Sequence, residues 1–142
     1  MKYERTTAVA ADPARVWDVL SDVERWPERI TTYQTVERLD DGPLKVGSRT
    51  RIKQDKLAAG VWEATEVVAG ESFVWTSRQP GVRLVGRHSV TVEPDGGARL
   101  TLEIEQSGPM SWMITLLLGR LVRRYVDVES AALKAAAEPV HA

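Results

Sequence analysis

The spacing of hydrophobic positions changes at about residue 110, from every second residue to every third and fourth. Before that point, short segments alternate apolar and polar side chains, as half-buried strands do, and turn-forming residues separate them. Short turns such as 94–97 join neighbouring segments, so we expect an antiparallel sheet. The pattern predicts seven strands over 2–10, 32–39, 49–54, 62–68, 73–77, 83–93 and 99–106.

Two short helices are predicted between the first two strands. Asp12 suits the N-cap of the first helix, and Pro13 suits its first helical position. A second helix is expected to begin at 21–22, to run through Trp26 and to stop at Pro27, because proline normally breaks a helix. The chain would therefore cross from its first strand to its second through a helical connection.

One long helix is predicted from Ser111 to Ala137, where the chain has no proline and a single glycine. At 1.5 Å per residue it would span about 40 Å. Its second half is amphipathic, and the expected sheet-facing positions are Leu121, Val122, Tyr125, Val128, Ala132, Leu133 and Ala136. The arginines of 120–124 would lie on the opposite, solvated face.

The first half of this helix, 112–118, is apolar nearly all round but too short to cross a bilayer. We expect all its faces to be buried, unless it lines a cavity mouth or an oligomer contact. A long helix after a meander of strands should lie across a curved sheet, and a cavity between the two is then the place to look for function. The prediction is a single α+β domain over 1–142, with a seven-stranded antiparallel sheet wrapped around a long C-terminal helix.

Composition narrows the functional classes. The net charge is −1 without a large basic cluster, which argues against nucleic-acid binding. The chain has no cysteine, so thiolate chemistry and disulfides are excluded. No signal peptide or transmembrane segment is recognisable, so we expect a cytoplasmic protein. Arginine outnumbers lysine and alanine is abundant, which favours a GC-rich bacterial genome.

His88 is the candidate for acid–base chemistry. Strand alternation places it on the same face as Leu84 and Val90, toward the interior, whereas His141 lies in the tail. Catalysis would need a second group, and Glu66 is the candidate if its strand turns that side chain inward. Strand alternation leaves it equally open whether the side chain of Glu66 faces the cavity or solvent. Otherwise His88 is a hydrogen-bonded interior histidine without chemistry.

Several other side chains are candidates for binding a ligand. Trp62 and Trp75 would offer large flat surfaces, although they could equally be plain core. The chain shows no metal-ligand constellation, phosphate loop or nucleotide fingerprint, so we expect no metal and no cofactor. The full predicted ligand-binding set is Tyr33, Gln54, Trp62, Trp75, His88, Leu117, Leu121 and Tyr125.

The chain resembles a known superfamily in several segments that together span almost its whole length. The resemblance is carried by 11–22 (ADPARVWDVLSD), Trp26-Pro27, 46–48 (VGS), 62–67 (WEATEV), Gly70-Glu71 and 73–75 (FVW). It is to the START-like, helix-grip superfamily, also called SRPBCC, which includes polyketide cyclases/dehydrases and Bet v 1-like proteins. This resemblance implies a helix-grip fold with a deep cavity for lipids, sterols, polyketides or other apolar metabolites.

Three functions stay open on the sequence. The first is binding of a small hydrophobic, aromatic or lipid-like metabolite in the cavity. The second is a cyclase or dehydratase type of enzyme in which His88 moves a proton. The third is binding of a macromolecular partner, or of a second copy in a homodimer, through the apolar segment 112–118. That third function predicts a small or filled cavity and an exposed apolar patch.

Overall fold

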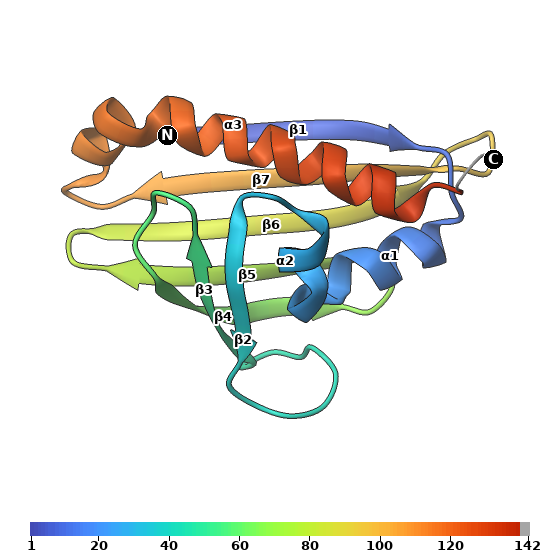
Figure 1. Ribbon diagram of the computed structural model, residues 1–142, viewed down its shortest axis with the longest axis horizontal. Helices are drawn as coiled ribbons and strands as arrows, with labels where there is room; N and C mark the ends of the chain where they lie inside the picture. Colours follow the sequence, from blue (N-terminus) through green and yellow to red (C-terminus); the bar gives the residue numbers. More distant parts are fainter. Residues whose placement is uncertain (140–142) are drawn as a thin grey trace.

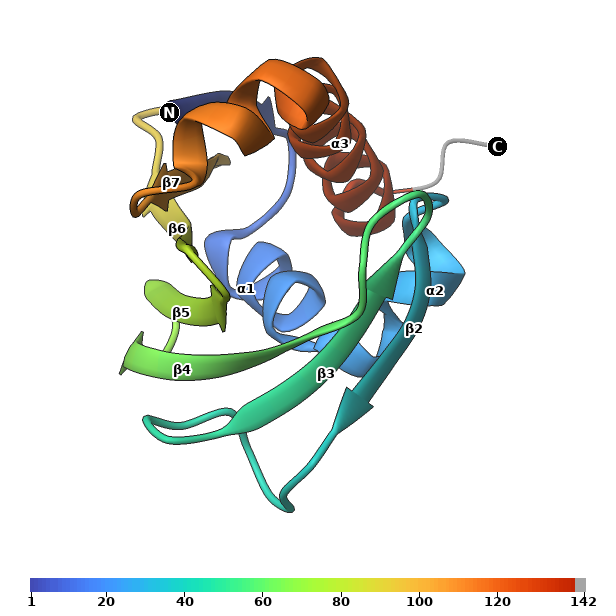
Figure 2. The same cartoon turned by 90° about the vertical axis from the view of Figure 1, so that its left-hand side faces the viewer.

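One strongly curved sheet surrounds the interior, and a long helix covers it (Figure 2). The computed structural model describes residues 1–139, so His141 lies outside the described residues. The elements are β1 (Lys2–Val9), α1 (Pro13–Ser21), the 3-10 helix η1 (Val23–Arg25), α2 (Trp26–Arg29), β2 (Tyr33–Arg38), β3 (Arg49–Gln54), β4 (Gly60–Val68), β5 (Ser72–Gln79), β6 (Val82–Val92), β7 (Ala98–Ser107) and α3 (Ser111–Ala137).

The strand order is β1-β7-β6-β5-β4-β3-β2, and every neighbouring pair is antiparallel. Strands β2 to β7 form a meander, and β1 pairs with β7 at the far edge. The helical connection through α1, η1 and α2 therefore carries the chain from one edge of the sheet to the other (Figure 1). The predicted seven-stranded antiparallel sheet with a long C-terminal helix and short helices after the first strand is confirmed.

Helix α1 begins as predicted. The side chain of Asp12 accepts a hydrogen bond from the backbone N–H of Ala14 at 3.1 Å, and Pro13 occupies the first turn. The prediction for Pro27 was wrong. Pro27 lies in the first turn of α2, where a missing N–H costs nothing, so it starts this short helix instead of ending one.

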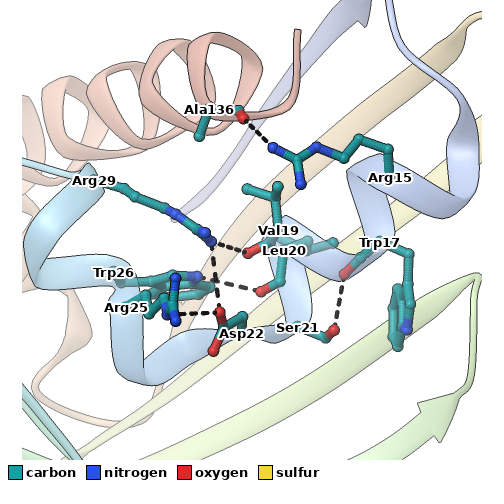
Figure 3. A network of polar contacts seen from close by, with 10 residues as sticks. All are labelled: Arg15, Trp17, Val19, Leu20, Ser21, Asp22, Arg25, Trp26, Arg29 and Ala136. Atoms are coloured by element: carbon teal, nitrogen blue, oxygen red, sulfur yellow. Dashed lines mark hydrogen bonds and ion pairs between the residues drawn. The ribbon is translucent and has the colours of Figure 1, made fainter. Parts of the chain in front are cut away.

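Side chains from the first two helices hold that end of the fold together (Figure 3). Two donors reach backbone carbonyls of the last turn of α1: Trp26 Nε1 bonds Leu20 O at 3.2 Å and Arg29 Nη1 bonds Val19 O at 3.4 Å. Arg15 Nη2 bonds the carbonyl of Ala136 in α3 at 3.2 Å. Trp26 is fully buried, so α1, α2 and the C-terminal half of α3 fill this end of the concavity with core.

Helix α3 is rotated from the predicted phase. Its buried side chains after Gly119 are Tyr125, Val126, Glu129, Ser130, Leu133 and Ala137. Val128 and Ala132 lie at the flank. Among the described residues, no helix is both long and apolar enough to cross a bilayer.

Burial of every face of the segment 112–118 was also a wrong prediction. Trp112, Leu116 and Leu117 are 64%, 76% and 70% exposed. The helix extends past the packed core at its N-terminal end, and the sheet covers one side of it alone.

A β-bulge decides the orientation of Glu66. The pairing of β4 with β5 shifts register between Ala64 and Glu66, so Thr65 is an extra residue in the strand. Ala64 is buried, yet Glu66, two residues later, is exposed, and Val67 packs on the core in its place. Strict alternation leaves the direction of the Glu66 side chain open, and the bulge turns it away from the cavity.

Candidate functional site

A cavity of about 100 Å³ lies between the concave face of the sheet and the inner face of α3. It occupies the part of the concavity that the core around α1 leaves free. Strands β2 to β7 and the second half of α3 all contribute to it. Its lining residues are Tyr33, Ile52, Gln54, Leu57, Trp62, Trp75, Leu84, Gly86, His88, Leu102, Glu103, Ile104, Gln106, Val122, Tyr125, Val126 and Glu129.

Aromatic rings form one wall of this cavity. The Trp75 ring lies edge-on to Trp26, with 5.4 Å between ring centroids, and its centroid is 5.8 Å from that of Trp62. Trp26 in turn packs edge-on against Tyr33 at 5.2 Å. Gly86 makes room for this arrangement, because a Cβ at that position would lie 2.9 Å from Trp75 Nε1. The wall is therefore packed from behind and offers a firm apolar surface.

His88 faces the interior, as predicted. It is 5% exposed, and its ring stacks on Phe73 with a centroid distance of 4.1 Å. Its Nδ1 lies 3.3 Å from the carbonyl oxygen of Phe73. Burial lowers the pKa of His88 to about 4, although the hydrogen bond to Phe73 opposes this shift. The ring is therefore neutral at pH 7.

The hydrogen bond of His88 also sets its tautomer. A carbonyl oxygen accepts and never donates, so the proton of the neutral ring sits on Nδ1. Nε2 is then left as a hydrogen-bond acceptor. His88 can take a proton or accept a hydrogen bond from a ligand hydroxyl, but at neutral pH it has no second proton to give.

The strongest polar feature of the cavity is a pair from opposite walls. Tyr33, at the start of β2, donates its hydroxyl hydrogen to Glu129 Oε1 of α3 at 2.6 Å. Burial raises the pKa of Glu129 to about 7, and the Tyr33 hydrogen bond opposes the rise. Burial, followed by the nearby Glu129, raises the pKa of Tyr33 well above its usual value. Glu129 thus changes protonation near neutral pH inside an apolar cavity.

Two further contacts lie around this cavity. Tyr125 donates its hydroxyl hydrogen to the backbone oxygen of Asp55 at 2.6 Å and so fastens α3 to the loop after β3. In the same loop, Lys56 has a φ of +63°, a left-handed conformation that non-glycine residues seldom adopt. On the β7 side, Thr115 Oγ1 donates to Gln106 Oε1 at 3.3 Å. These contacts close the space between the helix and the sheet.

The structure brings together most of the predicted ligand-binding residues. Six of the eight line the cavity: Tyr33, Gln54, Trp62, Trp75, His88 and Tyr125. Two do not, because the helix phase differs from the prediction. Leu117 points to solvent, and Leu121 lies at the flank of α3 beside the loop at Asp55.

Glu129 brings a carboxyl group into the cavity, and it was not among the predicted site residues. Glu66, the candidate if its strand had turned that side chain inward, is exposed on the outer face of the sheet. A signal for Glu129 existed, since it lies seven positions after Val122 and four before Leu133, on one helical stripe. The predicted sheet-facing stripe ran through Val128 and Ala132 instead, so it did not include Glu129.

The chain matches one family of known proteins along nearly its whole length. Residues 1–138 match the model of the family described as polyketide cyclase / dehydrase and lipid transport. No curated protein sequence matches the chain significantly.

Solved structures with the same fold share little sequence with this chain. A hypothetical protein from Helicobacter pylori, jhp0584, is similar with a TM-score of 0.80 at 14% identity, over 96% of this chain and 86% of that chain. The Zhui aromatase/cyclase from Streptomyces sp. R1128 is similar with a TM-score of 0.71 at 19% identity, over 96% and 93%. The di-domain ARO/CYC StfQ from the steffimycin biosynthetic pathway has a TM-score of 0.77 at 14% identity, over 96% and 50%. At such low identity these likenesses show the fold alone.

Proposed function

Since the chain belongs to the polyketide cyclase / dehydrase and lipid transport family, as its resemblance to SRPBCC proteins predicted, we propose that it binds a small, mostly apolar metabolite in its cavity. The ligand carries an aromatic ring or a short aliphatic body and one carbonyl or hydroxyl group. Its body lies against Trp62 and Trp75, and its polar group meets the pair of Tyr33 and Glu129 or the free Nε2 of His88.

The observation that carries this proposal is the division of the cavity wall into apolar and polar parts. Trp75, Leu102, Val122 and Val126 supply surface that gains free energy when a ligand removes it from water. The hydrogen-bonding groups are few and buried, which is the usual composition of a binding site for a small molecule. A plain hydrophobic core would not place an ionisable carboxyl group there, because burying it costs free energy.

The volume of the cavity limits the size of the ligand. An apolar cavity of roughly 150 Å³ holds benzene, whereas sites for drug-sized ligands need about 300–1,000 Å³. At about 100 Å³, this cavity accommodates a group smaller than one ring without movement. A larger ligand therefore has to part α3 from the loop after β3, where the hydrogen bond between Tyr125 and Asp55 now joins them.

Ligand binding is tested by filling the cavity. Val122→Phe adds a phenyl ring on the inner face of α3, and Val92→Phe is the matched control, because Val92 is 73% exposed. Ligands from panels of phenols, small aromatic ketones, quinones and fatty acids should raise the melting temperature of the wild type by mass action. We expect the Val92→Phe variant to keep this shift and the Val122→Phe variant to lose it. A panel without any thermal shift, together with a native protein from which no small molecule co-purifies, would count against the proposal.

Acid–base catalysis is the second candidate, and the titration of Glu129 favours it. A carboxyl group with a pKa of about 7 is half protonated at neutral pH, where general acid catalysis works best. Neutral His88 supplies a base in the same cavity. The pair suits the loss of water from a β-hydroxy ketone: a base removes the proton next to the carbonyl and an acid protonates the departing hydroxyl. Glu129 takes the place in this reaction for which Glu66 was the candidate.

The enzymatic alternative has its own test. Dehydration of small β-hydroxy ketones is followed by the ultraviolet absorption of the conjugated product. We expect Glu129→Gln to abolish turnover and Glu66→Gln to leave it unchanged, with a rate that falls as pH rises through about 7. If ligands bind but the wild type dehydrates none of them, the protein is a binding protein alone.

A further inference from the structure

The outer face of the N-terminal half of α3 exposes large apolar side chains beside arginines. Trp112, Leu116 and Leu117 are each more than half exposed. Arg120, Arg123 and Arg124 in the next turns are exposed too, and none makes an ion pair or hydrogen bond with another described residue. This set of six residues is here called the docking stripe.

Helical spacing puts these six side chains on one side of α3. Trp112, Leu116, Arg120 and Arg123 follow one another at intervals of four, four and three residues, and Leu117 and Arg124 lie seven apart beside them. The inner face of the same helix begins at Val122 and Tyr125, which line the cavity. The docking stripe is therefore the solvent-facing side of α3, the helix that covers the cavity.

The charge along this segment is one-sided. From Gly108 to Val126 the chain carries three arginines and no acidic residue. Asp127 follows on the same side of α3, but it already accepts a hydrogen bond from the Tyr3 hydroxyl at 2.7 Å and pairs with Arg5 at 3.9 Å. Any surface that covers the stripe has to take up apolar side chains and supply negative charge.

We propose that the docking stripe binds the surface of an anionic lipid bilayer. Leucine side chains enter the boundary between headgroups and acyl chains, and tryptophan is enriched at this interface. Arginines pair with lipid phosphates. A second copy of the chain fits less well, since a two-fold contact would gather six arginines against two Asp127 carboxylates that Tyr3 and Arg5 already bind. Docking places the helix that covers the cavity against the bilayer, and this proposal does not depend on which ligand the cavity binds.

Vesicle sedimentation tests the proposal with phosphatidylcholine alone and with phosphatidylcholine mixed with phosphatidylglycerol. We expect the wild type to bind the mixed vesicles and to be released by salt. Leu116→Ser/Leu117→Ser should weaken partitioning at least tenfold. Arg120→Gln/Arg124→Gln should weaken it about fivefold for each arginine. The control Arg49→Gln/Arg51→Gln removes the same charge from β3, on the other side of the molecule, and should have little effect (Figure 2).

Fluorescence locates the contact. Trp112 is the most exposed of the tryptophans, so its emission should shift to the blue on binding, and Trp112→Phe should abolish the shift while vesicle binding persists. Three results would overturn the proposal: no binding to either vesicle, equal binding to neutral vesicles, or a dimer that Leu116→Ser/Leu117→Ser dissociates. The last would identify a second copy as the occupant. Thermal shifts with small ligands in lipid-free buffer report on the cavity separately.

Discussion

The titration of Glu129 gives the sharpest test of the site, and Glu129→Gln is the change that isolates it. The ordinary pKa of a glutamate is 4.5, and burial raises that of Glu129 to about 7. Glutamine keeps the shape of the protonated carboxyl group but does not titrate. Comparing the two proteins over a range of pH therefore removes the contribution of all other ionisable groups.

The sign of the effect follows from the raised pKa. The folded protein binds the Glu129 proton more tightly than the unfolded chain does, so this group stabilises the fold fully below pH 4.5. The contribution is lost as pH rises through the folded pKa of about 7. A shift of about 2.5 pH units corresponds to about 3 kcal/mol at 1.36 kcal/mol per unit. The advantage of Glu129→Gln over the wild type should therefore grow by up to about 3 kcal/mol between pH 4.5 and pH 8.

Urea unfolding at a series of pH values measures this difference directly. Glu66→Gln is the matched control, since it makes the same change at an exposed position of β4. Tyr33→Phe is a second check: it removes the hydrogen bond that favours ionised Glu129, so the window of pH dependence should move upward. A difference between Glu129→Gln and wild type that stays flat from pH 4.5 to pH 8 would contradict a raised pKa of Glu129, because the carboxyl group would then be as well solvated as in the unfolded chain.

Three further changes probe the walls of the cavity. Relative to His88→Gln, the wild type should lose up to about 3 kcal/mol of unfolding free energy as pH falls from 6.5 to 4, because burial lowers the pKa of His88. A difference in urea unfolding that stays constant over this pH range would contradict the lowered pKa. Tyr125→Phe should cost about 1 kcal/mol and speed amide exchange, measured by mass spectrometry, in the loop at Asp55; unchanged exchange would show that the hydrogen bond does not close the cavity. Gly86→Ala should cost about 1–3 kcal/mol in urea unfolding, because its Cβ would lie 2.9 Å from Trp75 Nε1, and full stability would mean that the ring shifts freely.

The sequence predicted the framework of the fold from local signals. Strand alternation, turn chemistry and the proline-free run from Ser111 to Ala137 act within a few residues of one another, so their outcome can be read along the chain. The inward orientation of His88 followed in the same way, since β6 keeps its alternation along its inward face from Leu84 to Val90. The docking stripe could also be noticed in outline, because an apolar run beside arginines is a feature of the sequence itself.

Local signals were insufficient wherever two elements meet. The bulge at Thr65 arises from the pairing of β4 with β5, and it turns Glu66 outward against the simple alternation. The phase of α3 depends on how its inner face packs on the sheet. This packing buries Val126 and Glu129, whereas Val128, which was predicted to face the sheet, lies at the flank.

The sequence determines which side chains are available to the cavity, whereas the packing of α3 on the sheet determines which of them come into contact. Tyr33 and Glu129 are 96 positions apart, and nothing local to either one indicates a hydrogen bond of 2.6 Å. Their meeting depends on the curvature of the sheet and on the rotation of α3. Burial is also a property of the assembled fold, because only the packed walls exclude the water that would keep the pKa of Glu129 low. The same exclusion of water keeps His88 neutral, and so the chemistry of the cavity exists only once the whole chain has folded.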